Sequence, residues 1–68
     1  MSSTSTWTVT GMTCGHCVAS VREEVEEIAG VESVEVTLES GTVVVTSAEP
    51  VTREAVEAAV TEAGYALA

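Results

Sequence analysis

The chain has 68 residues, enough for one small domain but too few for a second domain or a deep catalytic cleft. Its eleven acidic residues are all glutamate and face two arginines and no lysine, so the formal net charge is -9. This balance excludes nucleic acid and anionic lipid surfaces as partners, because both bind to basic patches on proteins.

The first half of the chain predicts a strand, a helix and a second strand. The Ser/Thr-rich residues 1–5 are expected to be flexible, and one domain is expected over residues 6–68. Alternation over 6–10 predicts a strand with Trp7 and Val9 facing inward. Residues 15–29 predict a helix that Gly30 ends. Apolar side chains at helical spacing form its buried stripe: Val18, Val21, Val25 and Ile28.

The second half predicts a hairpin, a second helix and a short last strand. The strand 34–38 has an apolar face of Val34, Val36 and Leu38, and a Ser40-Gly41 turn leads into the strand 42–46. Thr52 is expected to cap a helix that ends at Gly64, before a strand over 65–68. Small apolar side chains form the buried stripe of this helix: Val56, Ala59, Val60 and Ala63.

This βαββαβ order predicts an α+β fold of the ferredoxin-like kind. Right-handed crossovers then place both helices on one face of a four-stranded antiparallel sheet. The segment 11–17 falls in the first loop and the opening turn of the first helix, next to Gly64-Tyr65 at one edge of the molecule. No apolar run is long enough to span a membrane and no export signal opens the chain, so we expect a cytoplasmic protein without membrane insertion.

Cys14 and Cys17 form one Cys-x-x-Cys, which admits three interpretations. They could be inert buried thiols, although a polar loop bracketed by glycines is not core sequence. They could form a dithiol oxidoreductase site, although no thioredoxin-length chain surrounds them. The third interpretation is a two-coordinate metal site, which suits Cu(I) because this soft ion prefers thiolates and accepts few ligands, whereas structural zinc needs four.

Three nearby side chains are candidates for supporting roles. Met12 could be a thioether ligand, but its position favours an anchor that holds the loop in the core. His16 is expected to be solvated, with a hydrogen bond to a thiolate or a bridge in a dimer as secondary roles. Tyr65 is expected to pack beneath the loop, with its hydroxyl near enough to order the site.

The segment 11–17, read Gly-Met-Thr-Cys-Gly-His-Cys, resembles the G-M-T-C-x-x-C signature of the heavy-metal-associated domain family. Gly30-Val31, the strand residues 34–36 and the closing Gly64-Tyr65 extend the resemblance to nearly the whole chain. The family includes bacterial copper chaperones and the N-terminal domains of copper-transporting P-type ATPases. Tyr65, and Thr13 in place of an acidic residue, make the bacterial copper branch the more similar one.

The resemblance implies that the protein is not an enzyme but a copper chaperone. Cys14 and Cys17 would hold Cu(I) and pass it by ligand exchange to a copper-exporting P-type ATPase in the cytoplasm. A domain excised from such an ATPase is the alternative within the family, and a dithiol oxidoreductase is the alternative from another class. The charge of -9 predicts a basic docking face on the partner. Two copies could also share copper in a homodimer.

Overall fold

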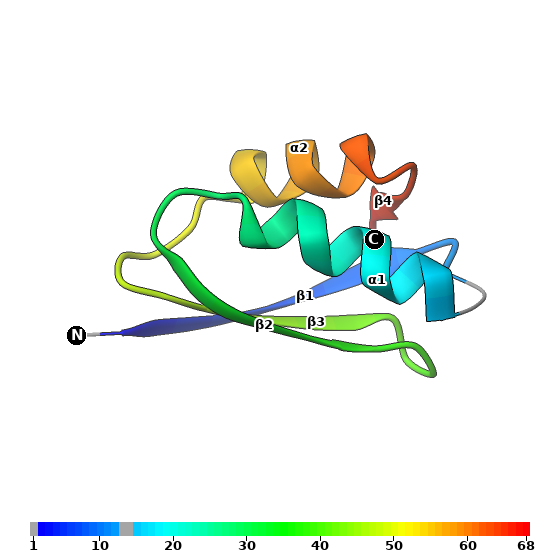
Figure 1. Ribbon diagram of the computed structural model, residues 1–68, viewed down its shortest axis with the longest axis horizontal. Helices are drawn as coiled ribbons and strands as arrows, with labels where there is room; N and C mark the ends of the chain where they lie inside the picture. The colour runs from blue at the N-terminus through cyan, green and yellow to red at the C-terminus, as the bar shows by residue number, and fades with distance from the viewer. Residues whose placement is uncertain (1, 13–14) are drawn as a thin grey trace.

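The computed structural model describes residues 2–12 and 15–68. The described chain runs β1 (Ser3–Thr10), α1 (Gly15–Glu26), β2 (Val31–Thr37), β3 (Thr42–Ser47), α2 (Arg53–Glu62) and β4 (Ala66–Leu67). The sheet order is β2-β3-β1-β4, and every neighbouring pair is antiparallel. Both helices lie on the same face of this sheet (Figure 1). The predicted α+β, ferredoxin-like βαββαβ fold is therefore confirmed.

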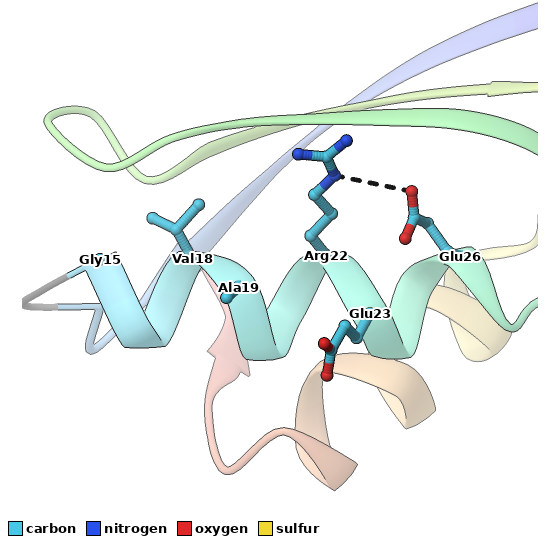
Figure 2. A pocket seen from close by; sticks show the side chains of 6 residues that line it. All are labelled: Gly15, Val18, Ala19, Arg22, Glu23 and Glu26. Atoms are coloured by element: carbon cyan, nitrogen blue, oxygen red, sulfur yellow. Dashed lines mark ion pairs between the residues drawn. The ribbon is translucent and has the colours of Figure 1, made fainter.

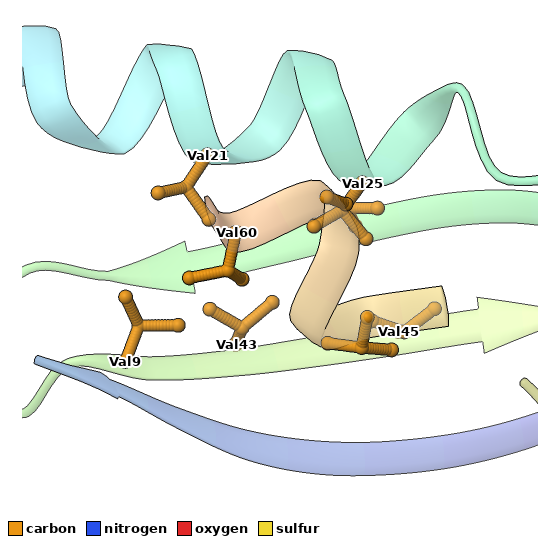
Figure 3. Packing of buried hydrophobic residues seen from close by; sticks show 9 residues of the cluster. Val9, Val21, Val25, Val43, Val45 and Val60 are labelled. Atoms are coloured by element: carbon orange, nitrogen blue, oxygen red, sulfur yellow. The ribbon is translucent and has the colours of Figure 1, made fainter. Parts of the chain in front are cut away.

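The core is a thin layer of valine between the helices and the sheet. Val43 and Val45 of β3 are fully buried and face Val21 and Val25 of α1 together with Val60 of α2 (Figure 3). The branched valines fit the pleated strand surface, and their short side chains let the helices lie close to it. The helices therefore pack directly on the sheet through these side chains.

The second helix begins and ends where the sequence predicts. The side chain of Thr52 accepts a hydrogen bond from the backbone N–H of Ala55 at 3.1 Å, as an N-cap residue does. At the other end Gly64 has a φ of 94°. A positive φ is strained for a residue with a side chain, so glycine suits this position. The turn at Gly64 brings Tyr65 back to the sheet edge.

Several element boundaries differ from the sequence prediction. β2 begins at Val31 and not at residue 34, and β4 spans only Ala66–Leu67. β1 begins at Ser3 instead of residue 6, because residues 3–5 continue the ladder with β3, Ser3 opposite Ser47. The expected flexibility of residues 1–5 and the domain bounds 6–68 stay predictions. α1 ends at Glu26 and not at residue 29, because Ile28 N–H bonds to the carbonyl of Val25 at 3.1 Å and tightens the chain into a turn.

The β2–β3 connection also differs from the prediction. The predicted two-residue turn at Ser40-Gly41 is a four-residue loop over 38–41, closed by a hydrogen bond of 2.9 Å from Gly41 N–H to the carbonyl of Thr37. The prediction that Leu38 faces the core is therefore wrong. Leu38 lies beyond the last residue of β2 and 38% of it is exposed.

Candidate metal centre

The loop that carries the Cys-x-x-Cys leaves β1 at one end of the molecule, and the α2–β4 connection lies at the same end (Figure 1). Gly11 has a φ of 90°, which turns the chain out of the strand. The predicted ligand Cys14 lies outside the described residues, as does Thr13. Gly15 then begins α1, so the described part of the site comprises Gly11, Met12 and the first turn of that helix.

Cys17 lies in the first turn of α1 with only 7% of its surface exposed. It shares a helical face with Val21 and Val25, four and eight residues later, both fully buried. The helix N-terminus carries partial positive charge, and the first turn of α1 contains no acidic side chain to offset it. Positive charge at a helix N-terminus stabilises a thiolate, which is the form of cysteine that binds metal.

Tyr65 closes the site from the side of the α2–β4 connection. A Cβ placed on Gly11 would lie 3.4 Å from Cδ1 of Tyr65, so the ring lies directly beside the loop backbone. The backbone of Tyr65 is fixed by a hydrogen bond of 3.0 Å from its N–H to the carbonyl of Val60. Tyr65 therefore lies beside the start of the first loop, and its expected proximity to the Cys-x-x-Cys stays a prediction.

Met12 and His16 differ in their surroundings. Met12 is partly buried and packs against the hydrophobic core, a position that suits a loop anchor. His16 is exposed in the first helical turn. The structure therefore brings Met12, Cys17 and Tyr65 to one end of the domain and leaves His16 on its solvent side.

A shallow groove of about 360 Å³ follows the solvent side of α1, away from Cys17. Its lining residues are Gly15, Val18, Ala19, Arg22, Glu23 and Glu26. Arg22 Nε lies 3.5 Å from Glu26 Oε2 along its wall (Figure 2). Both side chains of this pair are about half exposed, so it contributes little to stability. No sequence motif marks this surface, and its one signal is the four-residue spacing of Arg22 and Glu26, which is that of a helical ion pair.

Within residues 2–12 and 15–68, no group of three or more histidine, cysteine, aspartate or glutamate side chains is placed to hold a metal ion. In the same residues, no helix combines the length and the apolar character needed to cross a membrane.

The heavy-metal-associated domain family matches this sequence over residues 6–66, nearly its whole length. The chain belongs to this family. A COP-associated protein of Helicobacter felis is 42% identical over 59 residues, which cover 87% of this chain and 89% of that protein. Copper chaperone CopZ of Bacillus subtilis is 41% identical over 61 residues, which cover 88% of each chain.

Solved structures and a transporter extend the comparison. The structure of a CopZ metallochaperone has a TM-score of 0.89 and 34% identity, covering 97% of this chain and 100% of the other. A zinc/cadmium/lead-transporting P-type ATPase of Shigella sonnei is 39% identical over 61 residues, which cover 90% of this chain but 8% of the ATPase. The heavy-metal-associated domain thus occurs among these relatives both as most of a small protein and as a small part of a transporter.

Proposed function

We propose that this heavy-metal-associated domain carries Cu(I) between Cys14 and Cys17 in the cytoplasm and delivers it to a P-type ATPase. The observation that carries the proposal is the position of Cys17, in the first turn of α1 at the end of the domain where Tyr65 meets Gly11. Relatives of similar length include a copper chaperone, which supports copper as the cargo. The proposed role is transport of the ion and not catalysis.

The choice of Cu(I) follows from the small donor set. Two thiolates satisfy a soft monovalent ion in a near-linear arrangement, whereas zinc sites use three or four protein ligands. A bis-thiolate Cu(I) unit carries one negative charge, which the N-terminus of α1 stabilises. The ATPase relative that transports zinc, cadmium and lead makes Zn(II) the competing ion to measure.

Delivery is proposed to proceed by ligand exchange without redox chemistry. A thiolate of the partner bonds to the ion and gives a three-coordinate bridge, and one of the domain's two sulfurs then leaves. A second exchange completes the transfer, and copper stays Cu(I) throughout. Each donor bond is replaced as it breaks, so tight binding is compatible with fast transfer.

The supporting residues are proposed to hold the loop and not to bind the ion. Met12 anchors the loop in the core, where it is partly buried. Tyr65 limits the loop from its other side through its contact with Gly11. His16 is exposed, and we propose that it is not a ligand in the monomer.

The proposed partner presents a basic face to this acidic chain. The net charge of -9 favours such a surface, and attraction between exposed charges is screened by salt. Copper transfer to the partner should therefore slow as ionic strength rises. Equal rates at low and high salt would contradict the basic docking face. The alternative within the family is that this chain is a domain of an ATPase, and its acidic surface would then also bind a basic partner.

An anaerobic Cu(I) titration against a chromophoric chelator tests the metal site. Cys14→Ser and Cys17→Ser should each abolish tight binding, while Ser33→Ala, on exposed β2, should bind as the unchanged chain does. Undiminished binding in either cysteine variant would refute the site. Sedimentation at rising copper ratios would detect a copper-bridged homodimer, and disulfide reductase turnover without metal would favour the oxidoreductase alternative.

A further inference from the structure

β1 has an edge that only its last residues cover. β4 pairs with Val9 and Thr10, and Ala68 N–H donates to the carbonyl of Thr8 at 2.8 Å. Among residues 2–12 and 15–68, no strand pairs with Ser3–Trp7 on that side, whereas β3 pairs with these residues on the other side. Half of β1 is therefore an open edge within the described chain.

The backbone groups that point to this edge follow from two hydrogen bonds. Val9 N–H donates to the carbonyl of Gly41, toward β3, and the carbonyl of Thr8 accepts from Ala68, toward β4. Successive residues of a strand point their backbone groups to opposite sides, so even-numbered residues of β1 face the β4 side. Thr4 and Thr6 thus present their N–H and C=O groups to the open edge, and both residues are exposed.

The opposite edge of the sheet, formed by β2, is protected against pairing with another strand, whereas the β1 edge is not. β2 carries Glu32 and Glu35, and its ladder shifts register between Val31 and Ser33. Charged side chains and bulges are the usual devices that prevent pairing at an edge. β1 reads STSTWTVT and has neither charge nor proline, so nothing of this kind protects it.

We propose that the Thr4–Thr6 edge of β1 binds an extended, basic peptide segment of a partner as an added strand. The unpaired backbone N–H and C=O groups of a strand edge form hydrogen bonds with a partner segment that is itself extended. The charge of the peptide follows from α2, which contacts β4 and so covers this half of the sheet. At its beginning, away from the α2–β4 connection, α2 exposes Glu54 and Glu57 against Arg53. A second copy would bring another acidic α2 to the same place.

This surface goes beyond the proposed metal function. The N-terminal part of β1 lies at the end of the domain opposite the start of α1 and the α2–β4 connection (Figure 1). A segment bound there leaves the candidate metal centre exposed. Binding is accordingly expected to be the same in the metal-free and metal-loaded protein.

The probe is a blocked seven-residue peptide of alternating lysine and threonine, with binding followed by fluorescence anisotropy of a label. Thr6→Pro removes an N–H that faces the open edge, and proline is tolerated at such positions. It should weaken binding at least about tenfold, equivalent to 1.4 kcal/mol, with thermal unfolding unchanged. Thr6→Val keeps the N–H and is the matched control, expected to bind as the unchanged chain does.

A second measurement does not depend on the proline variant. Full methylation of the peptide's interior backbone nitrogens preserves its charge but removes its hydrogen-bond donors, and should also abolish binding. Hydrogen exchange should show new protection at the amides of Thr4 and Thr6 when the unmodified peptide binds. The proposal is overturned if the peptide does not bind, if the methylated or a glutamate-for-lysine peptide binds equally, if protection appears on β2, or if the chain dimerises through β1.

Discussion

The backbone N–H of Val9 donates to the carbonyl oxygen of Gly41 at 2.8 Å and joins β1 to the β2–β3 loop. Gly41 is buried and has a φ of 71°. A side chain at Gly41 would run into the carbonyl oxygen of Val9. This contact lies two residues before Gly11, so the loop packing also fixes the strand that leads into the candidate metal centre.

Gly41→Ala should therefore lower the free energy of unfolding by at least about 2 kcal/mol, since the positive φ alone costs an L-residue about 1–2 kcal/mol and a backbone clash adds to it. Gly30→Ala is the control. Gly30 has a φ of 87° but no atom within 4 Å of an added Cβ, so it should show the backbone cost alone. Urea unfolding measures both, and equal losses would show that the contact with Val9 has no effect.

Glu24→Gln should stabilise the protein at neutral pH. Burial raises the pKa of the Glu24 carboxyl. The pKa is raised further by the charge of Glu27 and a hydrogen bond with its side chain, and then by the charges of Glu62 and Glu23. The folded state therefore binds the proton more tightly than the unfolded state, and stability falls as pH rises through the raised pKa. Above that pKa the ionised carboxylate destabilises the fold, and glutamine removes this cost.

The gain from Glu24→Gln should disappear as pH falls below the ordinary glutamate value of 4.5, where both states are protonated. Thermal unfolding from pH 7 to pH 4 measures this. Glu35→Gln, on β2, removes the same charge elsewhere and controls for the general relief of repulsion. A gain from Glu24→Gln that stayed constant with pH would contradict the explanation.

Thr52→Ala should cost about 1 kcal/mol of stability, because the backbone N–H of Ala55 loses the side-chain acceptor at the start of α2. Thr61→Ala changes an exposed threonine of the same helix that caps nothing, and should be neutral or slightly stabilising. Chemical unfolding of the two variants gives the comparison. A smaller loss for Thr52→Ala than for Thr61→Ala would refute the role of the cap.

Cu(I) affinity should fall as pH is lowered, because protons compete with the ion for the thiolates of Cys14 and Cys17. Below the pKa of both thiols, the logarithm of the affinity should approach a slope of two against pH. Competition titrations from pH 8 to pH 6 measure this slope. An affinity that does not change over this range would exclude a site made of two thiolates.

Most of the fold can be predicted from the sequence, because the spacing of apolar residues and the positions of glycines determine local structure. Thr52 and Gly64 bound α2 as expected, since a cap and a positive φ depend on a few neighbouring residues. The start of β1 was misplaced because its inward positions before Trp7 are serines, which hide the alternation of an apolar pattern. Ser3 pairs with Ser47, a contact between distant parts of the chain that local periodicity cannot specify.

The candidate site and the position of Tyr65 near it follow from the sequence, whereas the open edge of β1 does not. The Cys-x-x-Cys spacing admits metal chemistry as one of three interpretations, and the βαββαβ order predicts Tyr65 near the first loop, where its ring lies beside Gly11. The open edge of β1 exists because β4 is only two residues long, Ala66–Leu67. The strand expected over 65–68 is longer and would cover more of β1. Alternating threonines at positions 4, 6, 8 and 10 were the available signal for one exposed face.

Trp7 is the single tryptophan of the chain, and its indole N–H donates to Ser5 Oγ at 2.9 Å. It is partly buried in β1 and adjoins the open edge. Its emission therefore reports on the strand. One sample can then show both events separately, strand pairing through intrinsic fluorescence and metal loading through thiolate absorption, without a label on the protein.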